Sequence, residues 1–134
     1  MTARTILVVD DEFGILELLH VVLEDEGFRV VTASNGRAAL DWMAGETPDL
    51  VITDMAMPVM DGAALIAAMA ADPALAGVRT IVMSSLPEAS IAERCSGYAA
   101  FLRKPFVESV FVAAVTALVA PRPSAVLEEE CPSR

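Results

Sequence analysis

The chain has 134 residues, enough for one domain with a complete core, and 55% of them are hydrophobic but only 5% aromatic, so that core must be aliphatic. Nineteen acidic residues against nine basic ones give a formal net charge of -10. Because no basic stripe is present, the charge argues against direct binding to nucleic acid or to an anionic membrane.

The first half of the chain alternates β-branched apolar runs with helical patterns. In chain order these predict a strand at 5–9, a helix at 13–26, a strand at 28–33, a helix at 37–44, a strand at 49–53 and a helix at 63–71. Gly27 and Asp72-Pro73 are typical signals for the end of the preceding helix. A loop over 55–62 separates the third strand from the third helix.

The second half repeats the alternation and predicts a strand at 79–83, a helix at 88–95, a strand at 99–103 and a helix at 107–119. Strand and helix therefore alternate five times, at lengths that fit right-handed crossovers and a parallel sheet covered on both faces. We assign residues 1–120 to one domain. Residues 121–134, rich in Pro, Ser and Glu, are predicted to form a disordered tail.

Three further features bear on the compartment. The two cysteines, Cys95 and Cys131, form neither a metal-ligand spacing nor a disulfide framework, which favours a reducing cytoplasm. The N-terminus has no long apolar segment typical of a signal peptide. The longest apolar stretch, 106–120, is too short to span a bilayer.

Polar side chains follow four of the predicted strands. They are Asp10 and Asp11 after the first, Asp54 after the third, Ser84 after the fourth and Lys104 after the fifth. The carboxyl ends of parallel strands meet at one edge, where open α/β sheets build their sites. Three carboxylates, a hydroxyl and an ammonium at one edge are suited to binding Mg²⁺ and a phosphoryl group.

The chemistry of that set can be stated in outline. Three crowded carboxylates favour a bound cation, and Mg²⁺ prefers carboxylate oxygens and phosphate-bearing partners. A carboxylate such as Asp54 can also act as a nucleophile and form an acyl phosphate. Lys104 would supply a positive charge to the phosphoryl oxygens, and Ser84 would supply a hydroxyl donor. Each piece alone has a plainer explanation, such as a helix N-cap for the Asp pair or a loop hydroxyl for Ser84; the joint occurrence carries the prediction.

Four motifs in this order resemble the receiver domain of two-component response regulators, the chemotaxis-regulator-like family. They are Val8-Val-Asp-Asp-Glu12, Asp54-Met-Ala-Met-Pro-Val-Met-Asp-Gly62, Val82-Met-Ser-Ser85 and Lys104-Pro-Phe106, and the resemblance covers residues 4–120. It implies a flavodoxin-like, doubly wound (βα)5 fold. The five parallel strands would lie in the order 2-1-3-4-5, with helices on both faces.

The resemblance also implies roles for the polar residues at this edge. Asp54 would accept a phosphoryl group from a histidine kinase or a histidine phosphotransfer protein. Asp11, Asp54 and the backbone carbonyl of Ala56 would bind Mg²⁺ directly, and Asp10 would hold it through water.

For the remaining site residues the resemblance implies contacts and a switch. Ser84 and Lys104 would each contact a phosphoryl oxygen, and the Lys104-Pro105 peptide would be cis, an isomer essentially limited to bonds before proline. On phosphorylation Ser84 would move toward the phosphoryl group while Phe101 turns inward. Plain core filling is the alternative for Phe101.

Three departures from the family pattern affect function. The segment between Ser84 and Lys104 is about two residues short and contains Pro87, which predicts a truncated fourth helix. Ala56 and Leu86 occupy positions that modulate self-dephosphorylation in the family. Neither can orient an attacking water, so we expect a long-lived phosphoryl group.

The third departure is the last predicted helix, which has Glu108 as its only charged residue. It could expose an apolar stripe that binds a partner or a second copy of the chain in a homodimer. The stripe would consist of Phe111, Val112, Val115 and Leu118. The alternative is that Ala113, Ala114 and Ala117 form most of the outer face and no partner is needed.

The sequence therefore predicts a cytoplasmic, stand-alone signalling receiver with no output domain in this chain. It would be no enzyme beyond its own phosphorylation and dephosphorylation, and an unknown downstream protein would bind it. One alternative is a docking receiver that needs no phosphate. Another is a haloacid-dehalogenase-type phosphatase, but the Thr expected after the first-strand acids is missing from Asp10-Asp11-Glu12-Phe13-Gly14 and no substrate cap is present.

Overall fold

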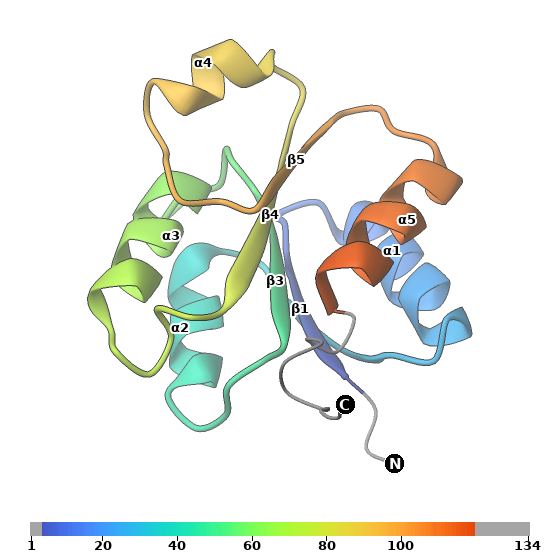
Figure 1. Cartoon of the computed structure of the whole chain (residues 1–134), viewed down its shortest axis with the longest axis horizontal. Coiled ribbons are helices and arrows are strands. Elements are labelled where there is room, and N and C mark those ends of the chain that lie inside the picture. The colour runs from blue at the N-terminus through green and yellow to red at the C-terminus, as the bar shows by residue number, and fades with distance from the viewer. Residues whose placement is uncertain (1–3, 120–134) are drawn as a thin grey trace, which may run out of the picture.

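The computed structural model describes residues 4–119, so the predicted tail at 121–134 lies outside the described residues (Figure 1). The strands are β1 Thr5–Val9, β2 Arg29–Ala33, β3 Leu50–Asp54, β4 Arg79–Ser84 and β5 Ala100–Arg103. The helices are α1 Phe13–Asp25, α2 Gly36–Met43, α3 Gly62–Ala71, α4 Glu88–Ala92 and α5 Glu108–Val119.

All five strands are parallel and lie in the order β2-β1-β3-β4-β5, which confirms the predicted topology. Helices α1 and α5 cover one face of the sheet, and α2 and α3 cover the other (Figure 1). The order reverses direction at β1, which is flanked by β2 and β3, and such a point is where open α/β sheets place their sites.

The core has two layers because the central strands are apolar on both faces. Ile6 and Val8 of β1 pack under α1 and α5, whereas Leu7 and Val9 pack under α2 and α3, and all four are fully buried. Side chains alternate along a strand, so a strand buried on both faces must be apolar at every position. Polar groups of the central strands are thereby left to the strand ends.

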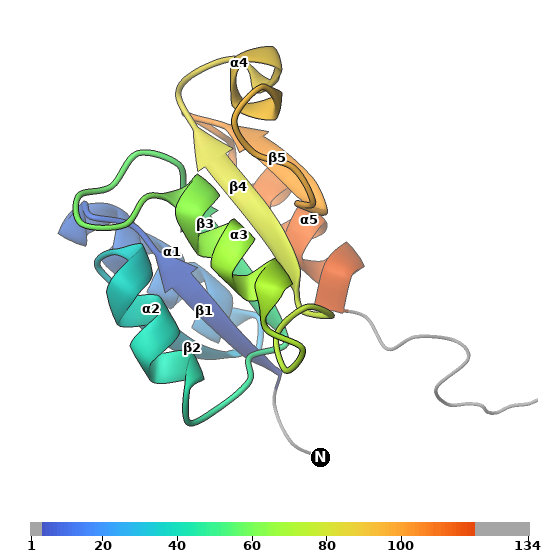
Figure 2. The same cartoon turned by 90° about the vertical axis from the view of Figure 1, so that its left-hand side faces the viewer.

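Helix α4 is the one element that lies apart from these layers. It spans five residues, Glu88–Ala92, directly after Pro87, which agrees with the predicted truncation. Figure 2 shows it beyond the carboxyl end of β4. Within α4 only Ile91 is buried, in a small cluster with Ile66 of α3.

Helix α5 corrects part of the sequence-based expectation. Phe111 and Val115, two members of the predicted exposed stripe, are fully buried against the sheet and α1, so the prediction of an exposed stripe was wrong for them. Ala113 and Ala117 are exposed, as the alternative for this helix expected. A homodimer through α5 stays a prediction. Among residues 4–119 no helix is long and apolar enough to cross a membrane.

Candidate functional site

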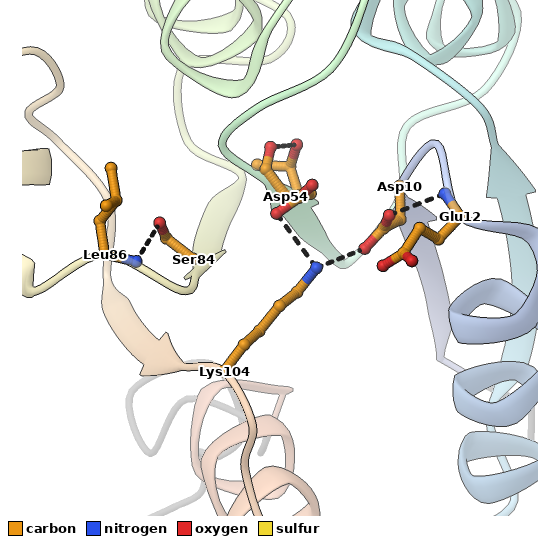
Figure 3. A network of polar contacts seen from close by, with 7 residues as sticks. Asp10, Glu12, Asp54, Ser84, Leu86 and Lys104 are labelled. Atoms are coloured by element: carbon orange, nitrogen blue, oxygen red, sulfur yellow. Dashed lines mark hydrogen bonds and ion pairs between the residues drawn. The ribbon is translucent and has the colours of Figure 1, made fainter.

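Three charged side chains from different strands converge at the carboxyl edge of the sheet. The Nζ atom of Lys104, just after β5, lies 3.0 Å from Oδ2 of Asp10 and 3.2 Å from Oδ1 of Asp54 (Figure 3). Asp10 follows β1 and Asp54 ends β3. The structure therefore joins three of the five residues that the sequence placed at this edge.

Backbone contacts fix Asp10 in this position. Its side chain is completely buried, and Oδ1 accepts a hydrogen bond from the backbone N–H of Glu12 at 2.9 Å. Its own backbone N–H donates to the carbonyl of Ala33 on the neighbouring strand at 3.1 Å. A carboxylate held at both its backbone and its side chain is preorganised for binding.

The loop after β3 folds tightly against the backbone of Asp54. The N–H of Gly62 donates to the carbonyl of Met55 at 2.9 Å. A Cβ atom at position 62 would lie 2.5 Å from the backbone oxygen of Asp54, so only glycine fits this close approach. The sequence had indicated no more than a loop boundary at Gly62; a contact of this kind depends on the path of the loop.

Burial and charge tune the ionisable groups. Desolvation raises the pKa of Asp54, and the nearby charge of Asp10 raises it further, against an opposing effect of Lys104. For Lys104, burial acts to lower the pKa, but the hydrogen bond to Asp10 and the charges of Asp54 and Asp10 outweigh it and raise the pKa. Lys104 is therefore a permanent cation in a site with an excess of negative charge.

The donor set fits a hard divalent cation. One oxygen each from Asp10, Asp11 and Asp54 can be chosen so that all lie within 4.8 Å of one another. Asp11 is exposed while the other two are buried, so the cluster opens to solvent on one side. Anionic oxygens at this spacing, with one open side, are typical of Mg²⁺ sites that also take a phosphate-bearing ligand.

Ser84 lies at the same edge but faces the loop that follows it. Its side chain is buried, and Oγ accepts a hydrogen bond from the N–H of Leu86 at 3.0 Å (Figure 3). Among the described residues no hydrogen bond joins Ser84 to Asp54. Phe101 is half-buried and packs against the cluster around Ile91. The peptide bond between Lys104 and Pro105 is cis, as the resemblance implied.

Comparison with known proteins identifies the family to which this chain is similar. The model of the response regulator receiver domain matches residues 6–116. Sporulation initiation phosphotransferase F of Bacillus subtilis is 36% identical over 108 residues, which cover 79% of this chain and 86% of that protein. The transcriptional regulatory protein PrrA of Mycobacterium tuberculosis is 36% identical over 128 residues, 92% of this chain, and the match spans about half (53%) of PrrA.

A solved structure agrees. The response regulator protein TrrA of Thermotoga maritima, determined in complex with Mg(2+)-BeF, has 29% sequence identity and a TM-score of 0.78, over 86% of this chain and 98% of that one. The family match covers most of the chain, including the acidic edge and all of the strands except the first residue of β1. The chain belongs to the response regulator receiver domains of two-component systems.

Proposed function

We propose that Asp54 accepts a phosphoryl group from a histidine kinase or a histidine phosphotransfer protein, and that this modification changes which proteins the chain binds. The observation that carries the proposal is the position of Asp54. Its carboxylate is buried at the end of β3 within 3.2 Å of a lysine ammonium and beside two further acids. A nucleophile held next to a fixed cation is suited to phosphoryl transfer.

In the proposed reaction an Oδ atom of Asp54 attacks the phosphorus of phosphohistidine. The new O–P bond forms as the N–P bond breaks, and the electron pair of that bond stays on the imidazole nitrogen, which then takes a proton. The product is an acyl phosphate on Asp54. Lys104 would leave Asp54 for a phosphoryl oxygen, and the Ser84 hydroxyl would donate a hydrogen bond to another.

Asp11, Asp54 and the backbone carbonyl of Ala56 would hold Mg²⁺ directly, with Asp10 contributing through water. When bound, the ion would neutralise the clustered carboxylates and the oxygens of the transferred group. The acidic cluster and the Mg(2+)-BeF complex of TrrA support this proposal.

We further propose that the chain works as a stand-alone cytoplasmic switch and not as a turnover enzyme. Its own phosphorylation and dephosphorylation would be its only catalysis. Sporulation initiation phosphotransferase F, 86% of which is covered by the match, supports this proposal. A receiver that docks without phosphate is the second candidate, and the test below separates the two. Membership of the receiver family removes the reason to consider a haloacid-dehalogenase-type phosphatase.

The test is the intact mass of the protein after incubation with acetyl phosphate, with and without Mg²⁺. We expect a gain of one phosphoryl group that requires Mg²⁺, is lost in Asp54→Ala and persists in Asp41→Ala. Asp41 is a suitable control because its carboxylate is exposed and, within residues 4–119, forms an ion pair with Arg37 on α2 alone. No gain in folded protein would favour the phosphate-independent docking receiver.

The lifetime of the phosphoryl group gives a second prediction. Ala56 and Leu86 are both exposed, and neither side chain has a polar group to orient an attacking water. We expect slow decay in the unmodified chain and several-fold faster decay in Ala56→Asn, measured by intact mass after removal of the donor. Fast decay without the substitution would contradict this prediction.

A further inference from the structure

The segment between β4 and β5 is held to the rest of the molecule by few contacts. Residues 85–90 are all exposed, and over 85–97 only Ile91 and Cys95 are buried. Both side chains pack in the small cluster that also contains Phe101. A segment with so little buried apolar surface opens at a low free-energy cost. A single hydrogen bond can therefore change which conformation the segment adopts.

One such hydrogen bond comes from Arg103, the last residue of β5. The regular pairing of β4 with β5 reaches the carbonyl of Ser84, which accepts from the N–H of Lys104 at 2.7 Å. The next carbonyl, that of Ser85, lies beyond the end of β4. It accepts a hydrogen bond from Nε of Arg103 at 3.0 Å, so a side chain continues the bonding where the strand has ended.

The same short loop determines where the Ser84 hydroxyl points. Its Oγ accepts from the N–H of Leu86, one residue beyond the carbonyl that Arg103 holds. Holding Ser85 in place therefore also favours the turn that keeps Ser84 facing Leu86. Movement of the Ser84 hydroxyl toward a phosphoryl group on Asp54 would break this hydrogen bond.

We propose that Arg103 is a positioning residue that holds the β4–α4 loop in the state in which Ser84 faces away from Asp54, and so limits how readily the chain accepts a phosphoryl group. This inference rests on the proposed function of Asp54. Loss of the Arg103 hydrogen bond would raise the population of loop states in which Ser84 is free to turn, and ligands that bind such states then act on a larger fraction of the molecules. Neither the four family motifs nor the charge pattern indicated a role for Arg103.

The experiment compares the rate of phosphorylation by acetyl phosphate in the full chain and in Arg103→Gln, Arg103→Lys and Arg79→Gln. Arg79 is a matched control because its Nη1 also donates to a backbone carbonyl, that of Leu118, but at the opposite end of β4. Amide hydrogen exchange of Ser85 and Leu86 is measured on the same proteins without donor. It reports the position of the loop independently of phosphorylation.

We expect Arg103→Gln to accelerate phosphorylation about three-fold, the effect of losing one hydrogen bond of ordinary net strength. Arg103→Lys should be accelerated too, because lysine keeps the charge but has no N–H at the position of Nε. Exchange at Ser85 and Leu86 should become faster in both variants and stay unchanged in Arg79→Gln.

Equal or slower phosphorylation in Arg103→Gln would overturn the proposal. Slower phosphorylation that Arg103→Lys restores would assign Arg103 to charge attraction of the donor, and acceleration in Arg79→Gln would indicate general loosening; either result also overturns it. If the unmodified chain gains no phosphoryl group, the proposed function fails, and unchanged hydrogen exchange in Arg103→Gln would show separately that Arg103 does not hold the loop.

Discussion

The carboxyl edge of the sheet has two parts that differ in how firmly they are built. In the acidic site at the ends of β1 and β3, Asp10 and Asp54 are buried and both pair with Lys104, and Asp10 also accepts a hydrogen bond from the N–H of Glu12. The flank made of the β4–α4 loop and α4 is largely exposed and is anchored by Ile91 and Cys95. Chemistry needs fixed geometry, whereas a change of binding partner needs an element that moves at low cost.

The difference indicates how a single modification can have a distant effect. Ser84 belongs to both parts, because its backbone ends β4 and its hydroxyl bonds to the loop. A phosphoryl group on Asp54 would attract that hydroxyl and thereby change the position of the β4–α4 loop and α4.

Gly62→Ala should have the largest effect, on the stability of the protein and on the acidic site. The added Cβ would lie 2.5 Å from the backbone oxygen of Asp54, and backbone cannot move aside as a flexible side chain can. We expect a loss of about 3 kcal/mol in the free energy of unfolding, measured by urea denaturation, together with loss of phosphorylation. Gly77→Ala is the control, since nothing lies within 4 Å of its added Cβ; equal stability of the two variants would contradict the close approach.

Ile91→Ala should affect the flank and leave the acidic site intact. Ile91 is completely buried, but the helix it anchors is only five residues long and can undock. We expect a loss of about 2 kcal/mol, at the low end for such a truncation, with phosphorylation retained. Leu65→Ala on α3, equally buried, should cost more. Loss of phosphorylation in Ile91→Ala would show that the two parts are not separable in this way.

Asp54→Asn should give a smaller gain in stability that depends on pH. Burial and Asp10 raise the folded-state pKa of Asp54 above its unfolded value, so its ionised form is disfavoured in the folded protein. The favourable contribution of this group is complete below the unfolded pKa and is lost as pH rises through the folded pKa. The variant should therefore melt at a higher temperature than the parent at pH 7 without Mg²⁺, with the difference vanishing in acid. A variant less stable than the parent at pH 7 would contradict a raised folded-state pKa of Asp54.

Val59→Asn should have the smallest effect. Val59, in the loop between β3 and α3, has a φ of 68° and a side chain that is 82% exposed. A β-branched residue in this left-handed conformation is strained, whereas asparagine adopts it readily. We expect a gain of about 1 kcal/mol in the free energy of unfolding. Val21→Asn, at an exposed valine inside α1 and without a positive φ, should be nearly neutral because valine and asparagine have similar helix propensities, and an equal gain there would argue against strain at Val59.

The sequence predicted that Asp10, Asp54 and Lys104 share one edge and that α4 is truncated, but it did not predict the contacts within the β4–α4 loop. Asp10, Asp54 and Lys104 could be placed together because ends of parallel strands share an edge whatever the loops do. The partners of Ser84 and Arg103, and the contact of Gly62 with Asp54, depend on irregular backbone, which has no periodic signal. For α5 the composition suggested exposure, but Phe111 is buried because the helix packs on both the sheet and α1.

The difference between the acidic site and the flank is tested most directly by amide hydrogen exchange across the chain, before and after adding Mg²⁺ with beryllofluoride as a phosphoryl mimic. We predict that exchange changes mainly over residues 84–98 and around Phe101, while β1 and the rest of the sheet change little beyond direct protection at the acidic site. Changes spread evenly over both parts, or confined to β1 and β3 with none between β4 and β5, would contradict the account.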